Sequence, residues 1–348
     1  MKELYLELEK IINKIDFDAL WPGFKRIDFS IFNDTCVYLK NEIIQRDERF
    51  LANTVIDFSD KPLAIWHIEK QENINIIELA GNLVHEMFHA FQVSKDEKRY
   101  PDELKFLQDV TDISYYQMLK DEITNLISGL DNKVVFEKYL GLKEYRYQKF
   151  PEVVKNELFA ETIEGTAEFV GLKAMKQLSL KTYHAQLDGY ISYLQKDKNL
   201  FNRRKLSYFI GALQFLCLET HKFKYSYKIT EKTKSTFEQI KKSKLIEPKI
   251  EVEENIEQLF NKHLENKKKK IEKFMNKKLS EIECYANLCG YDPMNMIEHK
   301  SYILCTNFAV LCGVDKKLIE GPVLLKIDEN YNVNKYFIKE TNHEQSSD

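Results

Sequence analysis

Apolar positions in the first 70 residues predict a short helical segment followed by strands. Residues 1–20 are expected to be helical and to end at a turn formed by Trp21-Pro22-Gly23-Phe24. Runs rich in β-branched and aromatic residues follow at about 27–40 and 53–69. These runs predict a small N-terminal β-sheet, in which residues 53–58 and 61–68 are successive strands.

The strongest helical pattern covers residues 76–93. Apolar residues recur there at spacings of three and four, which predicts a buried helix face; they are Ile77, Ala80, Val84, Met87 and Phe91. Asn73 or Asn75 is expected to cap the start of this helix. Gly81 lies inside it, where glycine is less stable than alanine by about 1 kcal/mol, so we expect another group to approach closely at this position.

A second helix is predicted over residues 156–178, with Pro151 as a break upstream. Three stripes run along it. The core stripe is Ala160, Ile163, Ala167, Val170 and Ala174, and the solvent stripe is Thr162, Thr166, Lys173 and Lys176. The third stripe is Glu157, Glu161, Glu164 and Glu168. Like charges four residues apart repel, and no lysine or arginine lies four residues on, so this stripe indicates a cation beside it.

Further helices are predicted on both sides of this one. Residues 102–130 look mostly helical and are expected to pack beside the helices already described, or over a cleft. A helix with a wide apolar face covers residues 204–220. Residues 237–282 are charged and helical, and the lysine run at 267–270 is expected to be a solvated face.

The last part of the chain changes in composition. Strands are predicted at 301–305, 308–311 and 322–327, and the tail from Glu340 looks disordered. The expected organisation is a catalytic region at 1–220, a charged helical segment at 221–283, a small β-rich C-terminal module at 284–340 and a disordered tail at 341–348. The fold class is therefore α+β, mainly helical, with a small N-terminal sheet and a β-containing C-terminal module.

Composition limits the classes of function. The 348 residues are 43% hydrophobic and 31% charged, which is typical of a globular chain. A net charge of −3 does not favour nucleic acid or an anionic membrane, and no run of 18 apolar residues predicts a membrane span. Because no signal peptide is recognisable, a cytoplasmic location is expected, with the six cysteines reduced. The four C-terminal cysteines fit no common zinc-finger spacing.

The segment His85-Glu86-Met87-Phe88-His89 carries the chemistry. On a helix, residues four apart point the same way, so His85 and His89 can bind one Zn²⁺. Glu86, one residue on, then reaches a water at the metal rather than the metal itself. Gly81 and Gln92 are expected on the same side of the helix as the two histidines.

A catalytic zinc site usually has a third protein ligand. The glutamate stripe supplies candidates, of which Glu164 is favoured and Glu161 is the alternative. Glu168, one turn after Glu164, is expected to orient a ligand histidine through its other ring nitrogen.

The H-E-x-x-H segment and the later Glu164-Gly165-x-Ala167-Glu168 helix resemble the gluzincin branch of the zincin metallopeptidases. The resemblance covers roughly residues 50–220 and implies a zincin-like core with His85, His89 and Glu164 as zinc ligands, Glu86 as general base and Glu168 as support for a histidine. The 75-residue spacer between His89 and Glu164 is longer than in short-spacer gluzincins, so Glu161 stays open as a ligand.

The resemblance also implies two further parts of a cleft. Ala64-Ile65-Trp66 is in the position of the strand that pairs with an extended substrate, although an ordinary sheet strand explains it equally well. Tyr208-x-x-Gly211 is similar to the helix that follows the glutamate helix, which makes Tyr208 the candidate donor to an oxyanion; a packing tyrosine is the alternative. Arg203 and Arg204 are either solvated or bind a substrate carboxylate.

These observations predict a zinc-dependent hydrolase, and the resemblance makes it a metallopeptidase acting on a peptide or protein substrate. One alternative is a zincin-fold binding or regulatory protein with a non-catalytic zinc site. The other is a zinc hydrolase of a non-peptide amide.

Overall fold

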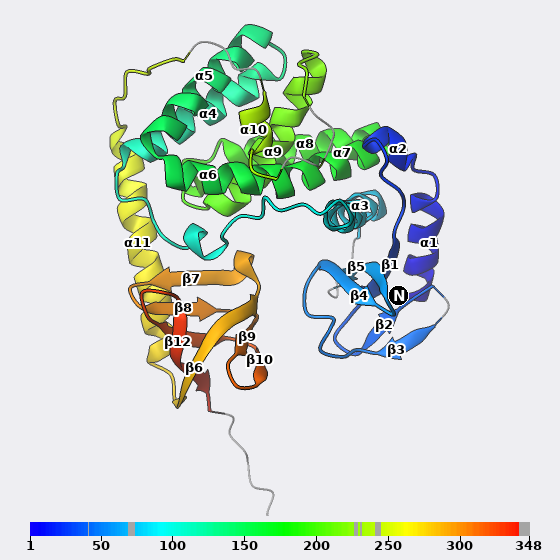
Figure 1. The fold of residues 1–348 in the computed structure, drawn as a ribbon, viewed down its shortest axis with the longest axis vertical. Coiled ribbons are helices and arrows are strands. Elements are labelled where there is room, and N and C mark those ends of the chain that lie inside the picture. Colours follow the sequence, from blue (N-terminus) through cyan, green and yellow to red (C-terminus); the bar gives the residue numbers. More distant parts are fainter. Residues whose placement is uncertain (41, 69–73, 226–228, 230–231, 241–244, 341–348) are drawn as a thin grey trace, which may run out of the picture. The chain divides into compact units, whose positions relative to one another are not determined.

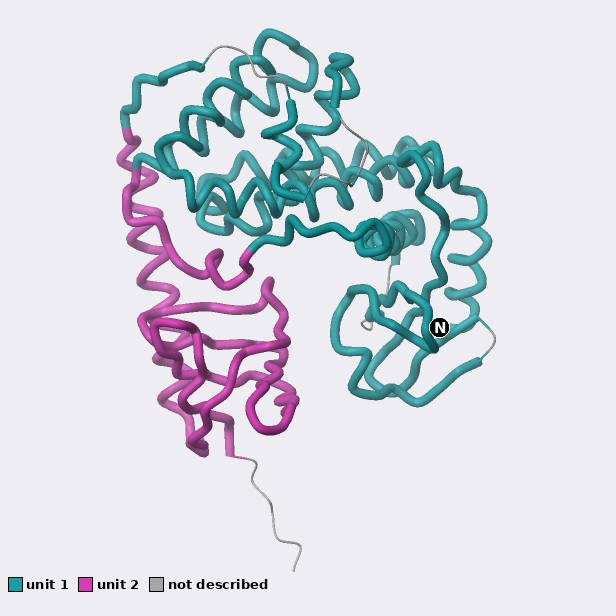
Figure 2. The backbone as a smooth tube through the Cα atoms, viewed as in Figure 1, with its two compact units in different colours: residues 1–101, 114–251 teal, residues 102–113, 252–348 magenta. Residues whose placement is uncertain are grey.

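The computed structural model describes residues 1–40, 42–68, 74–225, 229, 232–240 and 245–340. Two compact units make up the chain (Figure 2). Unit 1 contains residues 1–101 and 114–251, and unit 2 contains residues 102–113 and 252–348. This division differs from the predicted one, because residues 102–113 and the helix after 252 belong with the C-terminal strands rather than with the preceding segments.

Unit 1 begins with helices and a five-stranded sheet, as predicted (Figure 1). The helices are α1 (Lys2–Ile12) and α2 (Phe17–Leu20), and Gly23 takes a positive φ of 79° in the turn after them. The strands are β1 (Asp28–Phe32), β2 (Cys36–Tyr38), β3 (Ile43–Gln45), β4 (Thr54–Phe58) and β5 (Lys61–His67). Their order is β3-β2-β1-β5-β4, and only the β1–β5 pairing is parallel.

Strand β5 lies inside this sheet, so it cannot pair with a substrate. Its backbone pairs with β1 on one side, where Ala64 is opposite Phe29, and with β4 on the other, where Ala64 is opposite Val55. Of the two readings of residues 64–66, the ordinary sheet strand is therefore correct. Among the described strands, β4 is the sheet edge nearest in sequence to the helix that follows.

The remaining helices of unit 1 carry the candidate chemistry. They are α3 (Ile76–Ser94), α4 (Ser114–Gly129), α5 (Lys133–Lys149), α6 (Pro151–Ala160), α7 (Thr166–Leu178), α8 (Leu180–Leu194), α9 (Arg203–Thr220) and α10 (Thr236–Gln239), with a 3₁₀ turn at Asp197–Asn199. Asn75 caps α3 by accepting hydrogen bonds from the backbone N–H groups of Ile77 and Glu78. The alternative cap, Asn73, lies outside the described residues.

Two pairs of glycines let the central helices cross closely. A Cβ added at Gly171 of α7 would lie 2.9 Å from the carbonyl oxygen of Gly81 on α3. A Cβ added at Gly165 would lie 2.5 Å from Cα of Gly211 on α9. The close approach predicted at Gly81 is confirmed, and it comes from Gly171 and Met175 of α7.

The predicted glutamate helix is interrupted. It starts earlier than expected, at Pro151, and residues Glu161–Gly165 form a π-helical turn between α6 and α7. A π turn contains more residues than an α turn, so side chains after it point to a different side than regular helical spacing predicts. The glutamate stripe is therefore divided, and Thr162 and Thr166, predicted to face solvent, are buried.

Unit 2 is built on a seven-stranded antiparallel sheet in the order β10-β9-β6-β12-β11-β8-β7. Its strands are β6 (Leu279–Tyr291), β7 (Met296–His299), β8 (Tyr302–Cys305), β9 (Phe308–Cys312), β10 (Lys316–Glu320), β11 (Val323–Ile327) and β12 (Asn332–Lys339), and 3₁₀ turns cover Leu104–Phe106 and Pro293–Asn295. The three predicted C-terminal strands are confirmed as β8, β9 and β11. The single helix predicted at 237–282 is wrong, because α11 covers only Glu254–Met275 and β6 already starts at Leu279.

Helix α11 packs its apolar side on this sheet. Ile271 and Phe274 form a buried cluster with Leu304 and Leu324. Lys267 is not solvated as predicted, because its ammonium group is bound to the carboxylate of Asp109 and its side chain is 13% exposed.

A disulfide joins Cys289 on β6 to Cys312 on β9. The expectation that all six cysteines are reduced is therefore wrong for this pair. The pairing of β6 with β9 brings two cysteines that are 23 residues apart to a Cα–Cα distance of 5.9 Å. The other four are free, and the predicted disordered tail at 341–348 lies outside the described residues.

Candidate metal centre

Helix α3 presents His85 and His89 on one side, one turn apart. Their Nε2 atoms lie 3.0 Å from each other. His85 is 8% exposed, and the imidazole of His89 is 20% exposed, so both rings are largely shielded from water. The helical spacing predicted for the H-E-x-x-H segment is therefore present.

Glu164 lies in the π turn, and its carboxylate is next to the two histidine rings. Its Oε2 lies 3.1 Å from Nε2 of His89 and 3.6 Å from Nε2 of His85. In a tetrahedral zinc site with nitrogen and oxygen ligands at about 2.0–2.1 Å, neighbouring ligand atoms lie about 3.3 Å apart. The three atoms have spacings close to this value, and the three residues form a group able to hold a metal ion.

The Nδ1 atom of each ring lies 2.8 Å from a side-chain oxygen. Nδ1 of His85 lies 2.8 Å from Oε2 of Glu168, which can only accept a hydrogen bond. Nδ1 of His89 lies 2.8 Å from Oε1 of Gln92. The amide nitrogen of Gln92 donates to the carbonyl oxygen of Ile163 at 2.9 Å, and this leaves the amide oxygen to face His89. Both contacts favour a proton on Nδ1, so that two Nε2 lone pairs point to the place where the Glu164 carboxylate also points.

Glu168 is itself held in place by Tyr190. The phenol of Tyr190, on α8, donates a hydrogen bond to Oε1 of Glu168. No motif in α8 predicted this contact, which arises because α8 packs on α7, α9 and α3. The predicted position of Glu168 beside the outer ring nitrogen of His85 is observed.

The charges of the site act on one another. Burial lowers the pKa of His85, but contacts with Glu164 and Glu168 outweigh it and hold this pKa well above its ordinary value. Burial raises the pKa of Glu164, but the charge of His89 and hydrogen bonds with both histidines hold it well below its usual range. The three groups therefore share a position that attracts positive charge, from protons or from a metal ion.

Glu86 and Tyr208 both lie near these three residues. Glu86 is 8% exposed, and burial raises the pKa of its carboxyl group, with opposing contributions from the charges of His85 and His89. The ring of Tyr208 is parallel to that of His85, with 6.1 Å between centroids and 9° between planes. The fold thus brings together all five predicted site residues, His85, Glu86, His89, Glu164 and Tyr208.

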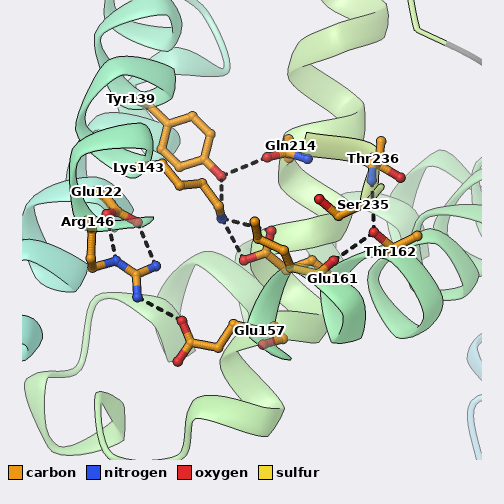
Figure 3. A network of polar contacts seen from close by, with 12 residues as sticks. Glu122, Tyr139, Lys143, Arg146, Glu157, Glu161, Thr162, Gln214, Ser235 and Thr236 are labelled. Atoms are coloured by element: carbon orange, nitrogen blue, oxygen red, sulfur yellow. Dashed lines mark hydrogen bonds and ion pairs between the residues drawn. The ribbon is translucent and has the colours of Figure 1, made fainter. Parts of the chain in front are cut away.

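Glu161, the alternative ligand, points away from the histidines. Its two carboxylate oxygens lie 2.6 and 2.8 Å from Nζ of Lys143 on α5, and Lys143 also donates to the phenol of Tyr139 (Figure 3). The neighbouring carboxylate of Glu157 pairs with Arg146 at 2.7 Å. The cations beside Glu157 and Glu161 are therefore protein side chains: Lys143 and Arg146 of α5, together with Arg203 of α9.

Both arginines predicted to be solvated or to bind a substrate carboxylate are buried and bound within the protein. Arg203 donates to Glu157 at 3.3 Å. Arg204 donates to Glu164 at 3.3 Å and to the phenol of Tyr208. Helical spacing brings Arg204 to Tyr208, which is four residues further along α9. It does not identify the pairs of Arg203 with Glu157 and Arg204 with Glu164, whose partners are 40 or more residues apart.

No family model, curated protein or solved structure matches this chain. Among the described helices, none combines the length and the apolar character needed to span a bilayer.

Proposed function

We propose that this protein is a zinc-dependent hydrolase, and that it acts as a peptidase. The observation that carries the proposal is the convergence of Nε2 of His85, Nε2 of His89 and Oε2 of Glu164, which lie 3.0, 3.1 and 3.6 Å from one another. Each of these atoms offers a lone pair, so a cation between them relieves their repulsion. Two nitrogens and one carboxylate are the donor set of the catalytic zinc sites in which a fourth position stays open.

Zinc bound there would polarise a carbonyl and lower the pKa of a water molecule. Glu86 is the base in this proposal: its carboxylate accepts a proton from the attacking water and returns it to the leaving amine. Tyr208 donates a hydrogen bond to the oxygen on which negative charge develops. Glu168 and Gln92 keep His85 and His89 in the orientation and tautomer that ligation needs.

Peptidase activity rests on the resemblance to gluzincins, whereas zinc and hydrolysis rest on the residues. Glu86 favours a hydrolase over a non-catalytic zinc site, because a site that only stabilises the fold has no use for a buried base beside its ligands.

The first test measures bound metal by elemental mass spectrometry in wild type, His85→Ala and Glu164→Ala. About one zinc per chain is expected in wild type and a loss in both variants, while His184→Ala, an exposed histidine of α8, serves as the matched control. Zinc retained by Glu164→Ala would remove Glu164 from the ligand set, and a metal-free wild type after reconstitution would refute the zinc site.

The second test asks for turnover on a mixed peptide library. Glu86→Gln should keep zinc and lose cleavage by about 10²–10⁴-fold, the usual contribution of a general base. Full activity in Glu86→Gln would refute the mechanism. Bound zinc with no peptide cleaved would refute the peptidase assignment and favour a non-peptide amide substrate or a non-catalytic site.

A further inference from the structure

Arg204 connects the candidate ligand Glu164 to Tyr208. Its Nη2 donates to Oε1 of Glu164 at 3.3 Å, and its Nη1 donates to the phenol oxygen of Tyr208. The guanidinium carbon lies 5.1 Å from the centre of the Tyr208 ring. Only 9% of the Arg204 side chain is exposed, so this buried cation is bound to two groups of the candidate site at once.

The contact with Arg204 gives the two carboxylate oxygens of Glu164 different partners. Oε2 lies 3.1 Å from Nε2 of His89, whereas Oε1 is the atom that accepts from Arg204. A carboxylate whose second oxygen is bound elsewhere ligates a metal through one oxygen only. This leaves a coordination position for water and substrate, as a catalytic zinc site requires.

The contact with Tyr208 sets the direction of its hydroxyl hydrogen. Guanidinium nitrogens donate and never accept, so the phenol oxygen is the acceptor from Arg204 and its own hydrogen points away from the arginine. A hydrogen bond accepted from a cation also polarises the O–H group and makes it a stronger donor.

Charge gives an independent reason for a cation here. Glu86, Glu164 and Glu168 place three carboxyl groups near the two histidines, and a zinc ion held there would supply two positive charges. The guanidinium of Arg204 supplies the third. Because a buried net charge is unfavourable, the site is balanced with Arg204 present and carries an excess negative charge without it.

We propose that Arg204 is a positioning residue that keeps Glu164 a one-oxygen ligand and directs the phenol of Tyr208 toward the reacting carbonyl. The proposal rests on the proposed zinc hydrolase function. In this proposal Arg204 binds Glu164 and Tyr208 of the protein itself and does not bind a substrate carboxylate.

The test replaces Arg204 with Lys and with Met and loads each protein with Co²⁺, whose visible absorption reports coordination number. Wild type should show the strong band of a four-coordinate ion. Arg204→Met should show the weaker band of five coordination, because Glu164 then uses both oxygens, and its Zn²⁺ affinity by chelator competition should fall by roughly tenfold. Arg204→Lys, which keeps the charge without the fork-shaped donor, should also change the band and is the variant to use if Arg204→Met does not fold.

Turnover tests the second part of the proposal, that Arg204 directs the phenol of Tyr208. In the peptide assay, kcat should fall in Arg204→Met and in Tyr208→Phe, while the double variant should be no slower than the slower single variant. Additive losses in kcat, or a cobalt band unchanged in both Arg204 variants, would overturn the role of Arg204. A wild type without any cobalt band would instead refute the zinc site itself, so the two failures are distinguishable.

Discussion

Nζ of Lys143 lies 2.6 Å from Oε1 of Glu161, and the two side chains are 0% and 3% exposed. This ion pair holds the first residue of the π turn against α5, and Glu164 is the fourth residue of the same turn. A contact made by α5 therefore fixes the start of the segment that carries the candidate third ligand (Figure 3).

Removing Lys143 should destabilise unit 1. Lys143→Met leaves the Glu161 carboxylate buried and without its main cation, which typically costs about 3–5 kcal/mol in free energy of unfolding. Urea unfolding followed by tryptophan fluorescence measures this, since Trp21 and Trp66 are both in unit 1. The control is Lys138→Met, an exposed lysine of the same helix, and equal stability of the two variants would contradict the structural role of the pair.

Glu168 should matter for metal affinity more than for folding. Glu168→Gln weakens the acceptor beside Nδ1 of His85, and loss of such a partner typically lowers metal affinity by about 10–100-fold. Tyr190→Phe should have the same effect to a smaller extent, because Glu168 then loses the hydrogen bond that positions it. Zinc affinity by chelator competition checks both, with the exposed Glu152→Gln as control; unchanged affinity in Glu168→Gln would show that His85 needs no support.

The Gly165–Gly211 crossing should not tolerate a side chain. Gly165→Ala places a Cβ 2.5 Å from Cα of Gly211, so α9 and the π turn must separate. Overpacking of this kind typically lowers stability by about 1–3 kcal/mol, and it should also move Arg204 and Tyr208 of α9 relative to Glu164. Gly189→Ala is the matched control: nothing lies within 4 Å of its Cβ, and alanine should stabilise α8 by up to about 1 kcal/mol. A Gly165→Ala protein as stable as wild type would mean that the crossing is adjustable.

Acid should weaken unit 2 through Asp109. Burial raises the pKa of this carboxyl, but a hydrogen bond from His263 and the charge of Lys267 outweigh it and hold the pKa below its ordinary value of 3.8. A depressed pKa contributes stability above that ordinary value, and the contribution is lost as the pH falls through the folded-state pKa. Asp109→Asn should therefore be less stable than wild type at pH 7 by about 1–2 kcal/mol, with a difference that narrows on acidification below about pH 4.

Neither tryptophan reports on unit 2, so this prediction needs hydrogen exchange of α11 and β8 peptides followed by mass spectrometry. The exposed strand residue Glu320, changed to Gln, is the control. A stability difference between Asp109→Asn and wild type that stays constant from pH 7 to acid would contradict the assigned role.

Local patterns predicted the elements that carry the site. The spacing of apolar residues and the Asn75 cap gave α3 to within a residue at its end, and H-E-x-x-H on that helix places both histidines on one side whatever packs against it. Glu164 and Glu168 were found by their spacing and by the family resemblance. The strands β1, β2, β4, β5, β8, β9 and β11 followed from short apolar runs.

The sequence by itself determined which residues can bind a metal, because ligand type and helical spacing are local properties. Only the tertiary structure decided which glutamate meets the histidines, since the π turn directs Glu161 to Lys143 and Glu164 to α3. It also decided the contact of Tyr190 with Glu168, that of Arg204 with Glu164, and the pairing of Cys289 with Cys312. These depend on packing between segments distant in the chain, and no residue's near neighbours in the sequence specify such packing.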